Sequence, residues 1–130
     1  MSTLSKEELI ERLKPTLKEQ GFKRTRATWR KSTDDLVFIL NVQGSQWSTV
    51  DYYINVGIHI KALGPEKNPT ENICHIRDRI EYSQTSESLI KEVLDWFERY
   101  GDLARLQVLK QQNNLPLMTM VVAHEYLAEM

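Results

Sequence analysis

Residues 36–43 read LVFILNVQ and residues 52–60 read YYINVGIHI, and these two runs decide the fold. The first run is nearly continuously apolar, which is typical of an inner β-strand. The second alternates branched apolar residues with small or polar ones, which is the period of a strand with one buried face. We therefore predict adjacent antiparallel strands at Leu36–Gln43 and Tyr52–Ile60. Four apolar residues of these strands should be buried against helices: Leu40, Ile54, Val56 and Ile58.

Two neighbouring segments can extend this sheet. Residues 22–31 alternate loosely around a turn at residues 25–27 and predict a third strand. Residues 72–82 fit either a strand, with Cys74, Ile76 and Ile80 on one face, or a helix that aligns Ile73 with Ile76 and Ile80. We favour the strand because β-branched residues and alternation agree. The result is an antiparallel β-meander of three to four strands.

Helical periodicity precedes and follows the strands. A capping box at Ser5 and an apolar stripe predict an N-terminal helix that ends at Gly21; the stripe consists of Leu9, Ile10, Leu13 and Leu17. From residue 86 the pattern predicts a helix closed by Gly101, then a helix capped by Asp102, then a helix that begins at Pro116. One face of this last helix should carry Leu117, Met120, Val121, His124 and Leu127. The fold class is α+β: an N-terminal helix, the meander, and C-terminal helices packed on one face in two layers.

Length and composition restrict the classes of protein. A chain of 130 residues, 41% hydrophobic and 27% charged, is typical of a single globular domain, here residues 1–130. The net charge of -1 makes nucleic acid an unexpected partner, and no apolar run reaches the ~18–20 residues of a membrane span. The single cysteine, Cys74, excludes an internal disulfide and fits a cytoplasmic location.

Charge is distributed unevenly along the chain. Residues 1–33 carry nine basic and four acidic groups, whereas residues 81–130 carry four basic and eight acidic groups. This asymmetry indicates either a partner-binding face or two halves of the fold that attract each other. The basic segment contains Lys23, Arg24, Arg26, Arg30 and Lys31. The aromatic residues near it are interpreted as core or loop-packing residues rather than as platforms for nucleic-acid bases: Phe22, Trp29, Trp47 and Tyr53.

The candidate binding patch consists of His75, Arg77 and Arg79, which share one face of the predicted strand. Guanidinium groups on one face can hold a phosphate or a carboxylate. The structural alternative is that Arg77 and Arg79 pair with acids of this chain, such as Asp34, Asp35 or Asp51.

No catalytic residues, metal ligands or cofactor are predicted. The sequence contains no glycine-rich phosphate loop, G-x-S-x-G, H-E-x-x-H or C-x-x-C motif. Cys74 and His75 are adjacent on a strand and would point to opposite faces, so they would not readily bind one ion together. His59 could meet His75 across neighbouring strands, which supplies two ligands and no more.

Three short motifs occur in a fixed order: N-V-Q-x-S-x-W at residues 41–47, I-N-x-G-I at 54–58 and C-x-I-R-x-R-I at 74–80. With the preceding Gly21-Phe22-Lys23 and Trp29-Arg30, the chain resembles the bacterial domain of unknown function 4304 family over about residues 5–100. The resemblance implies a compact α+β domain, and it brings no activity, cofactor or catalytic set.

We therefore expect a non-catalytic cytoplasmic binding protein, and its specific form would be an immunity protein that neutralises a toxin domain. The alternative is a small enzyme that acts on phosphorylated or nucleic-acid substrates through the His75, Arg77 and Arg79 patch. A cleft that gathers His75 with a second titratable group would favour the enzyme. A convex surface with an exposed apolar or charged patch would favour the binding protein. The sequence does not indicate an oligomeric state.

Overall fold

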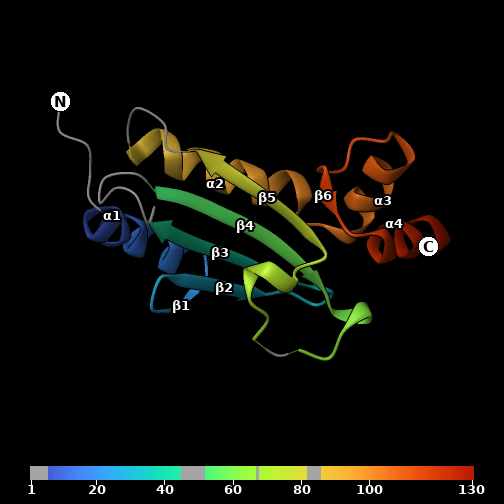
Figure 1. Cartoon of the computed structure of the whole chain (residues 1–130), viewed down its shortest axis with the longest axis horizontal. Helices are drawn as coiled ribbons and strands as arrows, with labels where there is room; N and C mark the ends of the chain where they lie inside the picture. Colours follow the sequence, from blue (N-terminus) through green and yellow to red (C-terminus); the bar gives the residue numbers. More distant parts are fainter. Residues whose placement is uncertain (1–5, 45–51, 67, 82–85) are drawn as a thin grey trace.

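A single antiparallel sheet organises the described part of the chain, with α1 and α2 against one of its faces and α3 and α4 at one end (Figure 1). The computed structural model describes residues 6–44, 52–66, 68–81 and 86–130. In chain order the elements are α1 (Lys6–Glu19), β1 (Lys23–Thr25), β2 (Thr28–Ser32), β3 (Leu36–Gly44), β4 (Tyr52–Ile60), the 3-10 turns η1 (Lys61–Leu63) and η2 (Glu71–Ile73), β5 (Ile76–Glu81), α2 (Ser86–Tyr100), α3 (Leu103–Gln111), β6 (Met118–Thr119) and α4 (Val121–Glu129).

The strands lie in the sheet in sequence order, from β1 at one edge to β6 at the other, and every neighbouring pair is antiparallel. The longest pairing joins β3 to β4, from Leu36 opposite Ile60 to Gly44 opposite Tyr52. The prediction of two adjacent antiparallel strands is therefore confirmed. The α+β class predicted from the sequence is confirmed as well.

The sheet has six strands rather than the three to four predicted. Residues 22–31 form two strands instead of one, because the chain reverses at Arg26-Ala27. Arg26 has a φ of 57°, in the left-handed region that two-residue hairpin turns use. The sixth strand contains only Met118 and Thr119, which lie opposite Arg77 and Ile76. Strands β1 and β6 are too short to show an alternating pattern in the sequence.

Residues 76–81 form strand β5, which confirms the preference for a strand over this part of residues 72–82. Cys74 precedes the strand, and its expected place on the face of Ile76 and Ile80 was wrong, because it follows turn η2 and packs with Val37 and Ile39. The register of β5 places Ile76 opposite Ile58 and Ile80 opposite Ile54. These isoleucines face the helices, so Arg77 and Arg79 project from the other face of the sheet. We call this other face, away from α1 and α2, the outer face.

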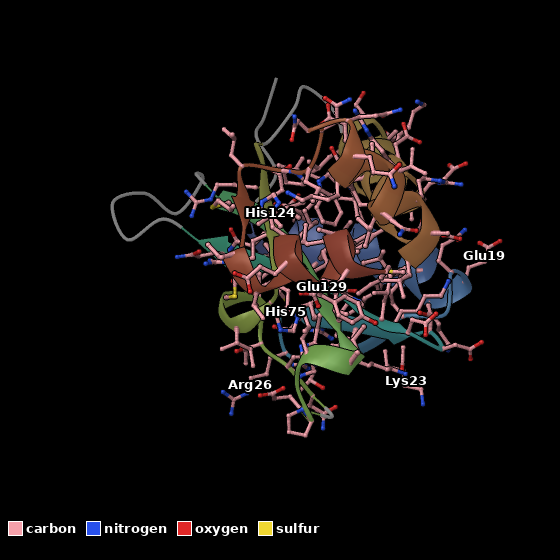
Figure 2. All side chains as sticks on the ribbon, turned by 90° about the vertical axis from the view of Figure 1, so that its right-hand side faces the viewer. Glu19, Lys23, Arg26, His75, His124 and Glu129 are labelled. Carbon is pink, nitrogen blue, oxygen red and sulfur yellow. The ribbon has the colours of Figure 1, made fainter. Side chains whose placement is uncertain are left out.

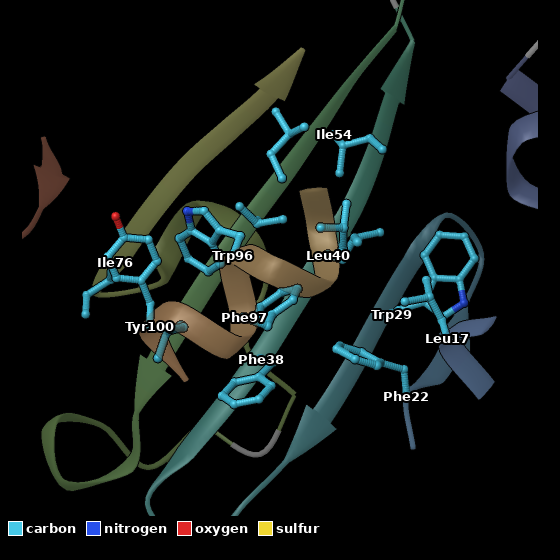
Figure 3. Close-up of a cluster of buried hydrophobic side chains, with 14 of the residues drawn as sticks. Leu17, Phe22, Trp29, Phe38, Leu40, Ile54, Ile76, Trp96, Phe97 and Tyr100 are labelled. Atoms are coloured by element: carbon cyan, nitrogen blue, oxygen red, sulfur yellow. The ribbon is translucent and has the colours of Figure 1, made fainter. Parts of the chain in front are cut away.

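The core lies between the sheet and the helices α1 and α2 (Figure 3). All four residues that the sequence assigned to it are fully buried: Leu40, Ile54, Val56 and Ile58. Aromatic rings fill the space beneath the helices. The centroid of Phe97 lies 5.5 Å from that of Phe22 and 5.1 Å from that of Phe38. Phe22 and Trp29 are 6% and 1% exposed, which confirms their interpretation as core residues.

Helix ends follow the expected local signals for α1 and α3. Gly21 has a φ of 92°, and its N–H bonds to the Lys18 carbonyl at 3.0 Å. Asp102 caps α3 by accepting a hydrogen bond from the Arg105 N–H at 3.1 Å. Both predicted signals are confirmed, whereas the capping box at Ser5 lies outside the described residues.

The last helix begins at Val121, not at Pro116 as the sequence suggested. The Thr119 N–H and hydroxyl both donate to the Pro116 carbonyl, at 3.2 Å and 2.6 Å, and the chain then pairs with β5 as strand β6. Leu117 and Val121, which were expected on a packed helix face, are consequently exposed. The residues of α4 that are buried are Ala123 and Leu127.

None of the helices in the described ranges is long and apolar enough to cross a bilayer.

Candidate functional site

His75 directly precedes β5, and Arg77 and Arg79 lie within it, but the surroundings of the three residues differ. His75 is buried, Arg77 is half-buried and Arg79 is exposed. The three residues therefore do not form one uniform anion-binding patch. Each has its own contacts, which decide its role.

His75 is a structural link between the end of β4 and the start of β5. Its ring Nδ1 accepts a hydrogen bond from the backbone N–H of Ile60 at 2.9 Å, and the backbone N–H of His75 donates to the Ile58 carbonyl at 3.0 Å. The imidazole stacks on His59 with 4.8 Å between ring centroids. Because Nδ1 must be unprotonated to accept the Ile60 N–H, His75 is held in its neutral form. A ring so engaged is poorly placed to act as a general acid or base.

The position of the His75 ring also disfavours its protonated form. Burial lowers the pKa of His75 first, and the neighbouring His59 lowers that pKa further, while Glu66 opposes both effects. His59 lies with Nε2 3.2 Å from the Gly64 carbonyl oxygen and 3.7 Å from the Glu66 carboxylate. Its Nδ1 is buried without a hydrogen-bond partner in the described part of the chain.

Acidification should destabilise the fold through His75. An unfolded imidazole takes up a proton near pH ~6.5, whereas the lowered pKa of folded His75 delays its protonation. Between these two values the unfolded state binds more protons, so the free energy of unfolding falls as the pH falls through ~6.5. We expect a loss of about 1.4 kcal/mol for each unit by which the pKa is lowered.

Urea denaturation of the wild type and of His75→Asn at about pH 7.5 and about pH 5 measures this effect. The asparagine oxygen can still accept the Ile60 N–H, but asparagine does not titrate. The variant should therefore lose less stability on acidification than the wild type. Equal losses in both proteins would contradict the role given to His75.

Arg77 is held by an acid of its own chain. Its Nε lies 2.9 Å from Glu71 Oε1 and its Nη2 lies 3.4 Å from Glu71 Oε2, so the guanidinium pairs at two points. Glu71 belongs to turn η2, and its side chain is only 12% exposed. Pairing of this kind was the structural alternative for Arg77, but the partner is Glu71 rather than Asp34 or Asp35, and Asp51 lies outside the described residues.

Replacing Arg77 by lysine should lower the free energy of unfolding by about 1 kcal/mol. An ammonium group is a single point charge and cannot reproduce the two-point contact with the half-buried Glu71. Urea melts of Arg77→Lys measure the loss. Asp95→Asn, which breaks the fully exposed Lys91–Asp95 pair on α2, is the matched control and should leave the melt unchanged. A similar response in both variants would contradict a structural role for the Arg77–Glu71 pair.

Arg79 belongs to a polar row on the outer face. Its Nε donates to Asn55 Oδ1 at 3.3 Å, and Asn55 Nδ2 donates to Gln43 Oε1 at 2.9 Å. The neighbouring Asn41 donates from Nδ2 to the Thr28 hydroxyl at 2.9 Å. These contacts orient amide and guanidinium groups across β2 to β5 on the face of the sheet that α1 and α2 do not cover.

A large exposed apolar surface lies beside this patch and was missed by the sequence analysis. Met118 of β6 is opposite Arg77 in the register, so their side chains share the outer face. Figure 2 looks onto this end of the molecule, with α4 toward the viewer. We call the following exposed residues the edge surface: Leu117, Met118, Met120, Val121 and Val122. Five of the six residues 117–122 are large and apolar, which is more than one face of a helix can bury. This excess was the feature of the sequence that indicated an exposed apolar surface.

A second surface gathers cations from two segments. A hollow of about 580 Å³ lies between α1 and the β1–β2 hairpin, and we call it the basic groove. Part of the predicted basic segment, Lys23 and Arg24, contributes to it. Lys14 and Lys18 of α1 also line the groove, and their position beside the hairpin could not be predicted from the sequence. Its lining residues are Lys14, Lys18, Gly21, Phe22, Lys23, Arg24 and Trp29.

The rest of the predicted basic and aromatic segment does not gather in this groove. Arg30 projects to the outer face and donates from Nε to the Pro69 carbonyl at 2.8 Å. Lys31 lies with its ammonium 6.0 Å from the ring centroid of Phe22. Trp47, in the link between β3 and β4, lies outside the described residues.

The surroundings of Cys74 and of the described metal-ligating side chains are as follows. Cys74 is buried, and this burial raises the pKa of its thiol to about 12, so the reactive thiolate is scarce near neutrality. No group of three or more His, Cys, Asp or Glu side chains in the described part of the chain could hold a metal ion. A wider hollow of about 830 Å³ lies between α1 and α2 over Phe22, Phe38 and Phe97, and His75 does not line it.

Comparison with known proteins gives one match. The family model described as "Domain of unknown function (DUF4304)" matches residues 13–111. No curated protein and no solved structure matches the chain. The matched range includes the basic groove, the His75 link and the Arg77–Glu71 pair, whereas the edge surface lies beyond residue 111.

Proposed function

The chain belongs to the DUF4304 family of domains of unknown function, and from this premise we propose that it is a non-catalytic protein-binding protein. Its contact surface is the edge surface together with the neighbouring Arg77 and Arg79. The observation that carries the proposal is the gathering of exposed apolar side chains at residues 117–122, where Leu117 is fully exposed.

The composition of the edge surface is that of a protein interface. Isolated exposed apolar residues are common, but a contiguous group at the rim of a sheet is typical of a surface that another protein covers. Methionine adapts its shape to a partner, and arginine beside apolar groups is enriched in interfaces. Met118 and Arg77 provide this combination on adjacent strands.

We propose an immunity protein as the specific form of this function, with a toxin domain as the partner in the cytoplasm. Helix α4 supports this choice through its charge. Val121, Glu125 and Glu129 are spaced four residues apart and share one helix face, so two exposed carboxylates extend the apolar surface. A toxin domain that acts on nucleic acid presents a basic surface, which an apolar patch bordered by carboxylates would complement.

Co-expression with a toxin encoded beside this chain tests the proposal. The wild type should bind the toxin and restore growth, and Leu117→Asp should weaken the complex at least about tenfold, because a carboxylate would be buried in an apolar contact. Val108→Asp is the matched control, since Val108 is an exposed apolar residue of α3 that does not belong to the edge surface. Isothermal titration and growth rates measure both effects.

The same experiment separates anchoring by the arginines from a purely structural role. In the double variant Arg77→Lys with Arg79→Lys, anchoring lowers the affinity for the partner, whereas a structural role lowers only the melting temperature. Turnover of phosphoesters or oligonucleotides by the wild type that is lost in His75→Asn would contradict the proposal and favour the enzyme.

A further inference from the structure

The basic groove lies at the end of the molecule opposite the edge surface. Figure 1 shows α1 and β1 at one end and β6 and α4 at the other, and β1 and β6 are the two outer strands of the sheet. A ligand of the basic groove would therefore be bound independently of a partner on the edge surface. The groove falls within the range that small ligands or short peptide segments occupy, at about 580 Å³.

Positive charge converges on the groove without acid in its lining. Lys14 is paired at the rim with Glu11 at 2.6 Å. Lys18, Lys23 and Arg24 form no ion pair with the other described residues. Like charges that are brought together by the fold repel one another, and a single acid at the rim, Glu11, which interacts with Lys14 and Arg24, does not balance the four cations of the groove. Charge complementarity thus calls for an acidic occupant.

The walls of the groove distinguish between classes of anion. Trp29 and Phe22 lie beneath it but are almost completely covered, and the Arg24 guanidinium lies 5.8 Å from the ring centroid of Trp29. Nucleic-acid bases need exposed aromatic faces for stacking, and none is offered here. The accessible walls are instead the methylene stems of lysine and arginine, with their charged ends in water. Such walls fit a small apolar side chain flanked by carboxylates.

We propose that the basic groove binds an acidic peptide segment of a partner protein. Strand β1 is an outer strand of the sheet, so an extended segment lying along it would direct alternate side chains toward the groove. Carboxylates of the segment then reach Lys18, Lys23 and Arg24, and an apolar residue between them lies over the stems of these side chains.

A fluorescein-labelled peptide, Glu-Glu-Leu-Glu-Glu, is the probe. Fluorescence anisotropy with the full chain should show binding that weakens at least about tenfold between about 50 mM and about 300 mM salt, because exposed charges are screened. The variant with Lys18→Gln, Lys23→Gln and Arg24→Gln should bind at least about tenfold more weakly than the wild type. Its control neutralises Lys91, Arg99 and Lys110 on α2 and α3 and should bind as the wild type does.

A measurement without substitutions keeps the test independent of folding. Peptide added to the isotopically labelled wild type should shift amide resonances within residues 14–29, and shifts confined to β6 and α4 would overturn the proposal. Three further results would overturn it. The first is a loss of peptide affinity in the control variant equal to that in the groove variant. The second is binding of a single-stranded oligonucleotide of the same charge as tightly as the peptide. The third is dimerisation of the chain through the groove at low salt, which would make a second copy the occupant.

Discussion

Replacing Leu40 by alanine should lower the free energy of unfolding by about 2–5 kcal/mol. Leu40 lies in the middle of β3, opposite Trp29 on one side and Val56 on the other, and all three side chains are buried. Truncation removes apolar contacts and leaves a cavity that neighbours on two paired strands cannot easily close. Urea denaturation of the variant measures the loss.

Leu117→Ala is the matched control for Leu40→Ala, because it makes the same chemical change at a fully exposed leucine. It should change the free energy of unfolding by less than about 0.5 kcal/mol. Comparison of the two variants separates the effect of truncating a buried side chain from the effect of the leucine-to-alanine change at an exposed position. A cost below about 0.5 kcal/mol for Leu40→Ala would contradict the position of β3 at the centre of the core.

The parts of the fold that were predictable are those with enough residues to display a period. Strands β3 and β4 each contain nine residues, so the apolar run of β3 and the alternation of β4 were both visible in the sequence, and the alternation gave the buried face of β4. The turn at residues 25–27 was predicted, but the separate strands β1 and β6 were not, since strands of two or three residues form through pairing with neighbours. The start of α4 was wrong for a related reason: pairing with β5 outweighed the helical spacing after Pro116.

The candidate site was only partly readable, because alternation gives the face of a residue but not its contacts. It placed Arg77 and Arg79 on one face, which the structure has as well. It could not find Glu71 as the partner of Arg77, because that contact depends on how turn η2 folds back over the sheet. Alternation also does not show that the lysines of α1 lie near Lys23, since this proximity depends on where the helix packs.

Replacing Gly101 by alanine should be the second most damaging change, with a loss of about 3 kcal/mol in the free energy of unfolding. Gly101 links α2 to α3, and its backbone passes close to the end of α2. A Cβ atom at this position would overlap the Phe97 carbonyl oxygen and would lie 2.6 Å from Cζ of Phe38. Neither neighbour can move freely, because Phe97 belongs to the helix backbone and the Phe38 ring is stacked on Phe97.

Gly64→Ala tests why alanine at position 101 should destabilise the fold. The cause is either that the atoms next to Gly101 cannot move, or simply that a new Cβ atom comes close to another atom. A Cβ at Gly64 would overlap the carboxylate oxygen of the exposed Glu66 side chain, which can rotate away, and it would lie 3.1 Å from Cε1 of the buried His59, a contact that a small shift of the ring relieves. Gly64 has an extended φ of -171°, which alanine adopts readily. Gly64→Ala should therefore cost less than about 1 kcal/mol in urea denaturation. If both alanines cost the same, the close approach of Phe38 and the α2 backbone at Gly101 is not what requires glycine there.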